Sequence, residues 1–116
     1  MRSLRAASNY AISLRNLNRF AEAKSLLLKT MPVARRVLGE SNELTLQMRW
    51  NYAKALYQDD CATLDDLREA VKTLEDTVRV ARRVFGGAHP LTERIEFDMR
   101  DAQETLRASE TLSRNA

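Results

Sequence analysis

The segment ARRVFGGAHPLT, residues 81–92, repeats much of an earlier segment, ARRVLGESNELT, residues 34–45. Aligned without gaps, the two share Ala-Arg-Arg-Val, an apolar residue, a glycine and a later Leu-Thr, at an offset of 47 residues. A glycine suits a left-handed residue just past a helix end, and Asn42 or the pair His89-Pro90 suits a helix start three residues later. The repeated segment therefore predicts a corner between two helices that the chain uses twice.

A second pair of segments confirms that the chain contains an internal repeat. SNYAISL, residues 8–14, matches WNYAKAL, residues 50–56, with Asn-Tyr-Ala and Leu in step at an offset of 42 residues. The two offsets differ by five residues, which places an insertion in the second copy at about Gln58 to Thr63. We expect a longer loop or an extra helical turn there. Self-similarity at a fixed period of this length is typical of repeat architectures.

Composition limits the class of protein. The chain has 116 residues, 44% hydrophobic and 30% charged, which corresponds to one domain or part of a longer array. Only two Pro and three Gly occur, so long uninterrupted helices are expected. The single cysteine, Cys61, excludes an internal disulfide framework and gives no metal-binding spacing. No run of 18 apolar residues is present, so we expect no membrane span.

Charge is distributed unevenly along the chain. Residues 1–58 carry ten Lys/Arg and three Asp/Glu, whereas residues 59–116 carry nine and thirteen. The basic half should attract anionic partners, although a chance imbalance on a solvated surface explains the same count. The first 21 residues are Arg-rich and lack acids, as in a mitochondrial transit peptide. The repeat favours a first helix of the fold instead, and we expect a cytoplasmic protein.

The apolar spacing predicts five helices in an all-α fold. Pro32 lies inside the second of them and should kink it or split it near Thr30 and Met31. The acidic stretch DDCATLDD, residues 59–66, does not match a calcium loop, and an N-cap at Asp60 or Thr63 is the simpler interpretation. Short connections force antiparallel neighbours, so the pairs should stack into a solenoid. The expected helices are about 3–17, 20–38, 43–58, 64–85 and 90–109, with a frayed tail over 110–116.

The combination N-x-A-x-x-L, F-x-E-A, A-R-R-V-L-G and H-P-x-T at a 42-residue period resembles the kinesin light chain type of tetratricopeptide repeat. The resemblance spans about Ser8 to Leu106. It implies a right-handed α-solenoid with repeat one at about 3–39, repeat two at about 42–86 and a closing helix at about 90–109. The sequence departs from the family pattern at Asn18, which replaces a turn glycine, and at Pro32. Asp98 also stands where the repeats have Asn.

The resemblance further implies a non-enzymatic protein-interaction module that binds an extended peptide in a concave groove. Arg5, Arg15 and Lys54 would select acidic side chains. Trp50 and Tyr57 would contact an aromatic or aliphatic anchor, while Asn amides would hold the peptide backbone. The implied groove residues are Arg5, Asn9, Ile12, Arg15 and Asn16 from the first repeat, Gln47, Trp50, Asn51, Lys54 and Tyr57 from the second, and Arg94 and Asp98 from the closing helix.

Other functions are less well supported by the residues. His89 is the one histidine and sits in a corner, and Cys61 has no neighbouring histidine, so the convergent groups that catalysis needs are missing. No glycine-rich phosphate loop and no cofactor motif occur. The Arg pairs belong to the repeated corners, which argues against nucleic-acid binding. The second candidate is a structural or oligomerisation segment of a larger repeat scaffold, because so short an array leaves apolar ends uncovered and open to self-association.

Overall fold

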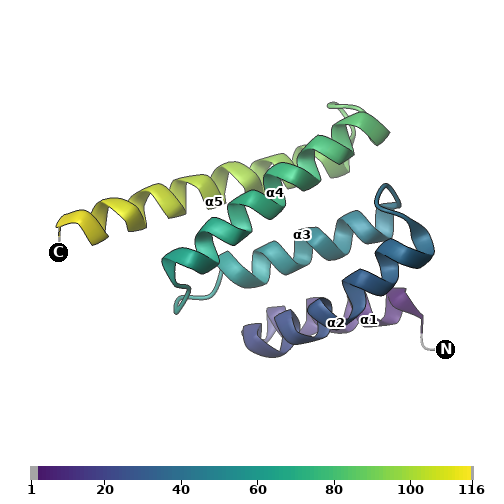
Figure 1. The fold of residues 1–116 in the computed structure, drawn as a ribbon, viewed down its shortest axis with the longest axis horizontal. Coiled ribbons are helices and arrows are strands. Elements are labelled where there is room, and N and C mark those ends of the chain that lie inside the picture. Colours follow the sequence, from purple (N-terminus) through teal and green to yellow (C-terminus); the bar gives the residue numbers. More distant parts are fainter. Residues whose placement is uncertain (1–2, 116) are drawn as a thin grey trace.

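The computed structural model describes residues 3–115, which form five helices and no strand (Figure 1). Each helix packs on the next one along the chain, and α3 also contacts α1 and α5. This arrangement confirms the predicted all-α solenoid of stacked helix pairs. The helices are α1 (Leu4–Asn16), α2 (Phe20–Leu38), α3 (Glu43–Tyr57), α4 (Leu64–Phe85) and α5 (Pro90–Asn115).

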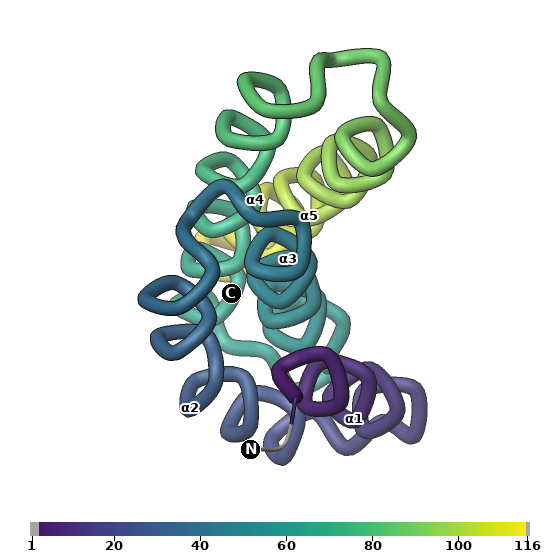
Figure 2. The backbone as a smooth tube through the Cα atoms, turned by 90° about the vertical axis from the view of Figure 1, so that its right-hand side faces the viewer, coloured from purple at the N-terminus to yellow at the C-terminus, as the bar shows by residue number. Residues whose placement is uncertain are grey.

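The helices form two layers. Viewed end-on, α1, α3 and α5 follow one another on one side, and α2 and α4 lie on the other (Figure 2). The core between the layers includes fully buried side chains from four helices: Leu27, Leu46, Leu74 and Ile95. Helix α3 lies at the centre, and Glu43 is its one exposed residue. The inner layer of α1, α3 and α5 is therefore the surface on which the predicted groove residues should meet.

Side chains cap the helix starts as the sequence predicts. Asn42 Oδ1 accepts a hydrogen bond from the Leu44 amide at 2.9 Å. Thr63, and not Asp60, caps α4, since its side chain accepts from the Asp66 amide while the Asp66 carboxylate accepts from the Thr63 amide. This reciprocal arrangement satisfies two backbone donors that would otherwise lack partners.

The two glycine corners have the same backbone geometry. Gly39 has φ 93° and ψ 160°, and Gly86 has φ 89° and ψ 156°. In both corners the amide three residues after the glycine donates to the glycine carbonyl, at 3.4 Å for Asn42 and 3.3 Å for His89. The positive φ was expected, but the ψ differs from the left-handed helical value and lies in a region that is essentially restricted to glycine. The repeated sequence thus encodes a repeated structure.

Helix α2 continues through Pro32 without a break, so the predicted split is wrong. Its axis nevertheless changes direction about halfway along, which confirms the predicted kink (Figures 1 and 2). Proline lacks an amide proton, so the carbonyl of Leu28 loses its usual helical partner. The Thr30 hydroxyl donates to the Leu26 carbonyl at 2.9 Å on the same stretch, a type of bond that also favours bending.

The insertion in the second repeat is absorbed in both predicted ways. The α3–α4 connection covers residues 58–63, whereas residues 17–19 connect α1 to α2. Helix α4 has 22 residues against 19 in α2, which is close to one additional turn. In the shorter connection Asn18 has φ 61°, a left-handed value that Asn tolerates and that explains why it can replace the turn glycine.

Helix α5 is longer than the sequence predicts. It runs to Asn115, so the expected frayed tail is wrong for residues 110–115, and Ala116 lies outside the described residues. The extension is tied to α4, because the Arg68 guanidinium lies 3.6 Å from the Glu110 carboxylate. The predicted ends of α1 and α3 are each one residue too long.

The corner geometry predicts the effect of three glycine substitutions. A Cβ at Gly39, Gly86 or Gly87 would meet no atom within 4 Å, so any cost must come from the backbone. Gly39→Ala and Gly86→Ala should each lower the free energy of unfolding by roughly 1–3 kcal/mol, because they force alanine into a glycine-only region. Gly87→Ala is the matched control, since Gly87 has no positive φ, and should change it little. Urea unfolding monitored by circular dichroism measures all three, and equal effects at Gly86 and Gly87 would contradict this account.

Candidate functional site

The structure brings predicted groove residues from three helices together on the inner face, defined here as the surface that Arg15, Trp50, Lys54, Tyr57 and Asp98 form. These residues come from α1, α3 and α5, which lie side by side in the inner layer (Figure 2). Trp50, Lys54 and Tyr57 recur at spacings of three and four, so they share one side of α3. The spacing of these three residues along α3 therefore places them together at the centre of the site.

Asp98 is the polar centre of the inner face. Its Oδ2 accepts a hydrogen bond from Trp50 Nε1 at 2.7 Å and lies 4.0 Å from Lys54 Nζ. The Lys54 ammonium also lies 4.2 Å from the centroid of the Trp50 ring, within the range of a cation–π interaction. Both charged side chains are mostly buried, with 14% of Lys54 and 16% of Asp98 exposed. One carboxylate thus orients both the predicted cation and the predicted aromatic anchor.

Two more bonds join the three inner helices. Arg15 Nη1 of α1 donates to Gln58 Oε1 at 3.0 Å, just beyond the end of α3. The Tyr57 hydroxyl donates to Asp101 of α5 at 3.4 Å. Arg15 Nε is also buried, and it has no hydrogen-bond partner within the described residues. The guanidinium of Arg15 therefore keeps unused donor capacity at the site.

Positive charge is in excess at this point. Burial lowers the pKa of Lys54 from its ordinary value, and the charges of Arg15 and Arg94 lower it further, while Asp98 opposes them. Burial also lowers the pKa of Arg15, again against the effect of Asp98. Lys54 and Arg15 are thus both incompletely solvated, and each has the other as a like charge nearby. Such an arrangement favours an added anion.

The remaining predicted groove residues differ in how far they are exposed to solvent. Arg5, Asn9, Asn16 and Arg94 are exposed, and Ile12 and Gln47 are half-buried.

Two predicted contact residues are not accessible. Asn51 is 5% exposed, and its Nδ2 donates to the Gln47 carbonyl at 2.9 Å within α3, so it does not present its amide to a peptide backbone. Tyr57 is 7% exposed because α5 packs beside it, which leaves Trp50 as the accessible aromatic of the pair. The helical spacing that puts both on one side of α3 does not show which of them α5 covers.

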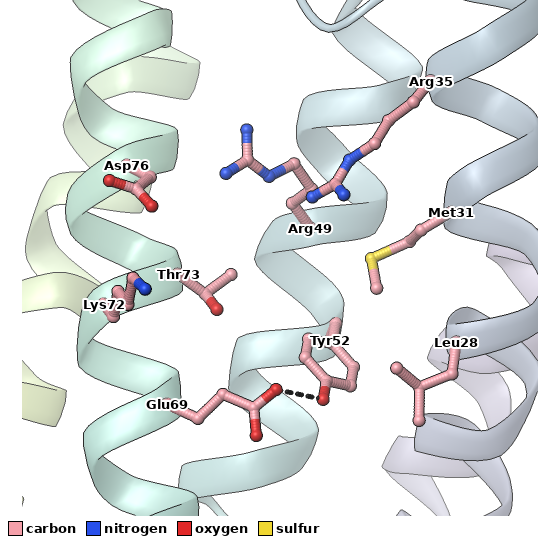
Figure 3. Close-up of a pocket in the computed structure, with 9 residues that line it drawn as sticks. All are labelled: Leu28, Met31, Arg35, Arg49, Tyr52, Glu69, Lys72, Thr73 and Asp76. Carbon is pink, nitrogen blue, oxygen red and sulfur yellow. Dashed lines mark hydrogen bonds between the residues drawn. The ribbon is translucent and has the colours of Figure 1, made fainter.

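A second cluster, on the opposite side of α3, was not predicted. Arg49 and Tyr52 face away from the inner face and line a cleft of about 310 Å³ between α2 and α4 (Figure 3). The sequence carries one signal for it, since Arg49 stands in the apolar stripe of α3 between Leu46 and Ala53, at spacings of three and four. An arginine at such a position is buried against the neighbouring layer, and here its side chain is 10% exposed.

The two buried tyrosines predict how stability depends on alkaline pH. Burial raises the pKa of Tyr52, aided by its hydrogen bond to Glu69. Burial also raises that of Tyr57, aided by the charges of Asp98 and Asp101. Above about pH 10 the unfolded chain ionises these groups and the folded chain does not. The unfolded state then holds fewer protons, so the free energy of unfolding falls as pH rises.

Phenolate absorbance of the folded protein should accordingly show Tyr52 and Tyr57 resisting ionisation until the chain unfolds. The variants Tyr52→Phe and Tyr57→Phe should each make the alkaline loss of stability less steep. Ionisation of Tyr52 and Tyr57 near pH 10 in a protein that remains folded would contradict the burial described here.

Comparison with known proteins places the chain in a family. Among residues 3–115, no helix is both long enough and apolar enough to cross a membrane. No curated protein and no solved structure matches the chain. The tetratricopeptide repeat family matches residues 3–42, which hold α1, α2 and the first corner, and residues 62–91, which hold α4 and the second corner. These ranges cover more than half of the chain, and the chain therefore belongs to the tetratricopeptide repeat family, whose members are generally protein-interaction modules.

Proposed function

We propose that the inner face binds an extended acidic segment of a partner protein, with an aromatic or aliphatic residue of that segment as its anchor. The observation that carries the proposal is the group of three cations, Arg15, Lys54 and Arg94, around the carboxylate Asp98. A partner carboxylate that approaches this group would find donors already held in place, because Asp98 and Gln58 fix the neighbouring side chains. Preorganisation of this kind lowers the cost of binding.

The anchor contact is assigned to Trp50. Its indole is half-buried and is fixed by the bond to Asp98. A rigid aromatic surface loses little conformational entropy on binding. Phe97 of α5 is 68% exposed and stands 47 residues after Trp50, at the corresponding position of the next repeat unit. Asp101, which accepts from Tyr57, would disfavour partner acids at that end of the face and give the bound segment a direction.

We also propose a repeat type and a cellular compartment for the protein. The 42-residue offset and the shared corner segments support a repeat of the kinesin light chain type. We propose a cytoplasmic module without enzymatic activity that acts by bringing protein partners together, and that needs no cofactor, metal or nucleic acid.

The single tryptophan allows a direct test, because Trp50 lies within the proposed site. Its fluorescence should respond to an acidic peptide that contains one Leu or Phe, and should respond weakly to the same peptide with each Glu replaced by Lys. Arg15→Gln should weaken binding about three- to tenfold, since a partly buried ion pair contributes on the order of 1 kcal/mol. Added salt should weaken binding without abolishing it.

Lys29→Gln is the matched control, because it removes one positive charge from an exposed position on α2, in the outer layer. It should leave the affinity unchanged. Equal affinity for the acidic and the Lys-substituted peptide would contradict the proposed function.

A second candidate function is self-association within a larger scaffold. It is favoured by two large apolar side chains that α5 leaves exposed, Phe97 at 68% and Leu112 at 72%. Sedimentation of the chain over a range of concentrations decides between the two. A monomer that binds the acidic peptide supports the first proposal. An oligomer that dissociates with Phe97→Ser, and that shows no peptide binding, supports the second.

A further inference from the structure

The cleft between α2 and α4, called the outer cleft, forms because those two helices do not pack against each other. No Cα atom of α2 lies within 8 Å of a Cα atom of α4, and α3 forms the floor between them (Figure 3). Its volume of about 310 Å³ is at the lower end of ligand pockets. The outer cleft can therefore hold about one or two side chains. It is lined by Leu28, Met31 and Arg35 of α2, Arg49 and Tyr52 of α3, and Glu69, Lys72, Thr73 and Asp76 of α4.

Arg49 is the unusual residue of the outer cleft. Its side chain is 10% exposed, and its Nε is buried without a hydrogen-bond partner among the described residues. The nearest carboxylate oxygen belongs to Glu40, at 3.8 Å, and Glu40 also lies 3.5 Å from Arg35. The Glu40 side chain is 59% exposed, so it compensates the buried charge only in part. Burying an arginine with so few partners lowers the stability of the fold unless another group pairs with its charge.

The two acids that α4 contributes to the outer cleft are engaged with groups other than its arginines. Burial lowers the pKa of Arg49, and the charge of Arg35 lowers it further, while the charges of Glu40 and Asp76 oppose both effects. Asp76 is 2.9 Å from Arg79, which lies outside the outer cleft, and Glu69 accepts a hydrogen bond from the Tyr52 hydroxyl. Both carboxylates of α4 are thus already engaged. Figure 3 shows the guanidinium of Arg49 extending into the space between the helices, with that of Arg35 directed toward it from α2.

The other end of the outer cleft is apolar. Leu28 of α2 is 54% exposed, although it belongs to a helix that packs against the core, and it faces the ring of Tyr52 (Figure 3). Met31 lies between this apolar end and the arginines (Figure 3). A ligand that fits both ends carries an anionic group next to an aliphatic or aromatic group.

The nature of the anion follows from the acids that remain in the outer cleft. Glu69 and Asp76 would repel a doubly charged phosphate more strongly than a singly charged carboxylate. An arginine guanidinium pairs with a carboxylate through two parallel hydrogen bonds, and Nε can be one of the donors. We propose that the outer cleft is a second binding site, which takes an Asp or Glu side chain of a partner protein together with the apolar residue beside it.

Nuclear magnetic resonance tests this proposal, because the Nε–H group of Arg49 gives its own signal. The probe is the blocked tripeptide Leu-Glu-Leu, and the matched control is Leu-Gln-Leu, which has the same shape without the charge. The Arg49 Nε–H signal and the backbone amides of Tyr52 and Lys72 should shift with the Glu peptide and remain in place with the Gln peptide. Equal shifts with both peptides would overturn the proposal.

Variants separate the outer cleft from the inner face. Arg49→Lys and Arg35→Gln should each weaken binding of the Glu peptide at the outer cleft by about tenfold, equivalent to 1.4 kcal/mol. Arg36→Gln, an exposed neighbour on α2, is the charge-matched control and should leave it unchanged. Because Arg35 is 42% exposed, its variant should fold even if the Arg49 variant does not. Lys54→Gln should leave the outer-cleft shifts intact, so failure of the inner-face proposal would not affect this result.

Three further outcomes would overturn the assignment. Shifts that appear at Lys54 and Asp98 and disappear with Lys54→Gln would place the carboxylate on the inner face alone. A stronger response of the Arg49 signal to inorganic phosphate than to the Glu peptide would show that the anion is not a carboxylate. An equal response to free 4-methylpentanoate, which has the carboxylate and the apolar group but no peptide, would show that the ligand is a small molecule instead of a protein segment.

Discussion

Burial of α3 on nearly every side is the constraint on which the rest of the structure depends. Four helices pack around it, and Glu43 is its one exposed residue. A central helix in an array this small cannot be wholly apolar, because it also forms the floor of both surfaces of the solenoid. Lys54 and Arg49 are consequently buried charges on opposite sides of α3. Each buried cation needs a negatively charged partner. At both proposed binding sites the carboxylates of the chain itself meet that need only in part.

The repeated corners hold α3 in this position. A positive φ at Gly39 and Gly86 reverses the chain sharply, and the residue three positions later directly precedes the next helix. Because both corners have the same geometry, α3 and α5 leave their corners in the same way, and their inner sides are presented to a common surface. The local chemistry of a few residues thus determines which side chains of α3 meet those of α5.

Most of the fold could be predicted from the sequence, because its signals are local. The structural effects are confined to one or two helical turns around Gly39, Asn42, Thr63 and Pro32. The observed helix bounds agree with the predicted ones to within a residue, apart from the end of α5. The last part of α5 contacts α4 through Arg68 and Glu110, which are 42 positions apart, so no local pattern reveals that contact.

The candidate site was predictable only as a set of residues on one side of three helices. Spacing places Trp50 and Tyr57 on the same side of α3, but the packing of α5 decides that Tyr57 is covered. The role of Asp98 as acceptor for Trp50 and partner of Lys54 likewise depends on how closely α5 approaches α3. The outer cleft depends on the separation of α2 and α4, which is a property of the whole stack.

The two faces of α3 each hold a buried cation, but they differ in structure. The inner face, where we propose that an extended segment binds, has a carboxylate, Asp98, that orients its cation and its aromatic ring. The outer cleft holds an arginine whose nearest acid, Glu40, is mostly exposed. A partner with several acidic and apolar residues could therefore contact the repeat on both sides, and each contact would add to the effective concentration for the other.

The central claim is that Lys54 contacts a carboxylate of the bound segment directly. A double-mutant cycle tests it, with calorimetric affinities for wild-type and Lys54→Gln protein, each against a peptide with Glu or Gln at the position opposite Lys54. The account predicts that the two changes are not additive, with a coupling energy of about 0.5–3 kcal/mol, the range found for residues in contact. Additivity at every Glu position of the peptide would contradict it, because it would show that Lys54 acts only through the general charge of the inner face.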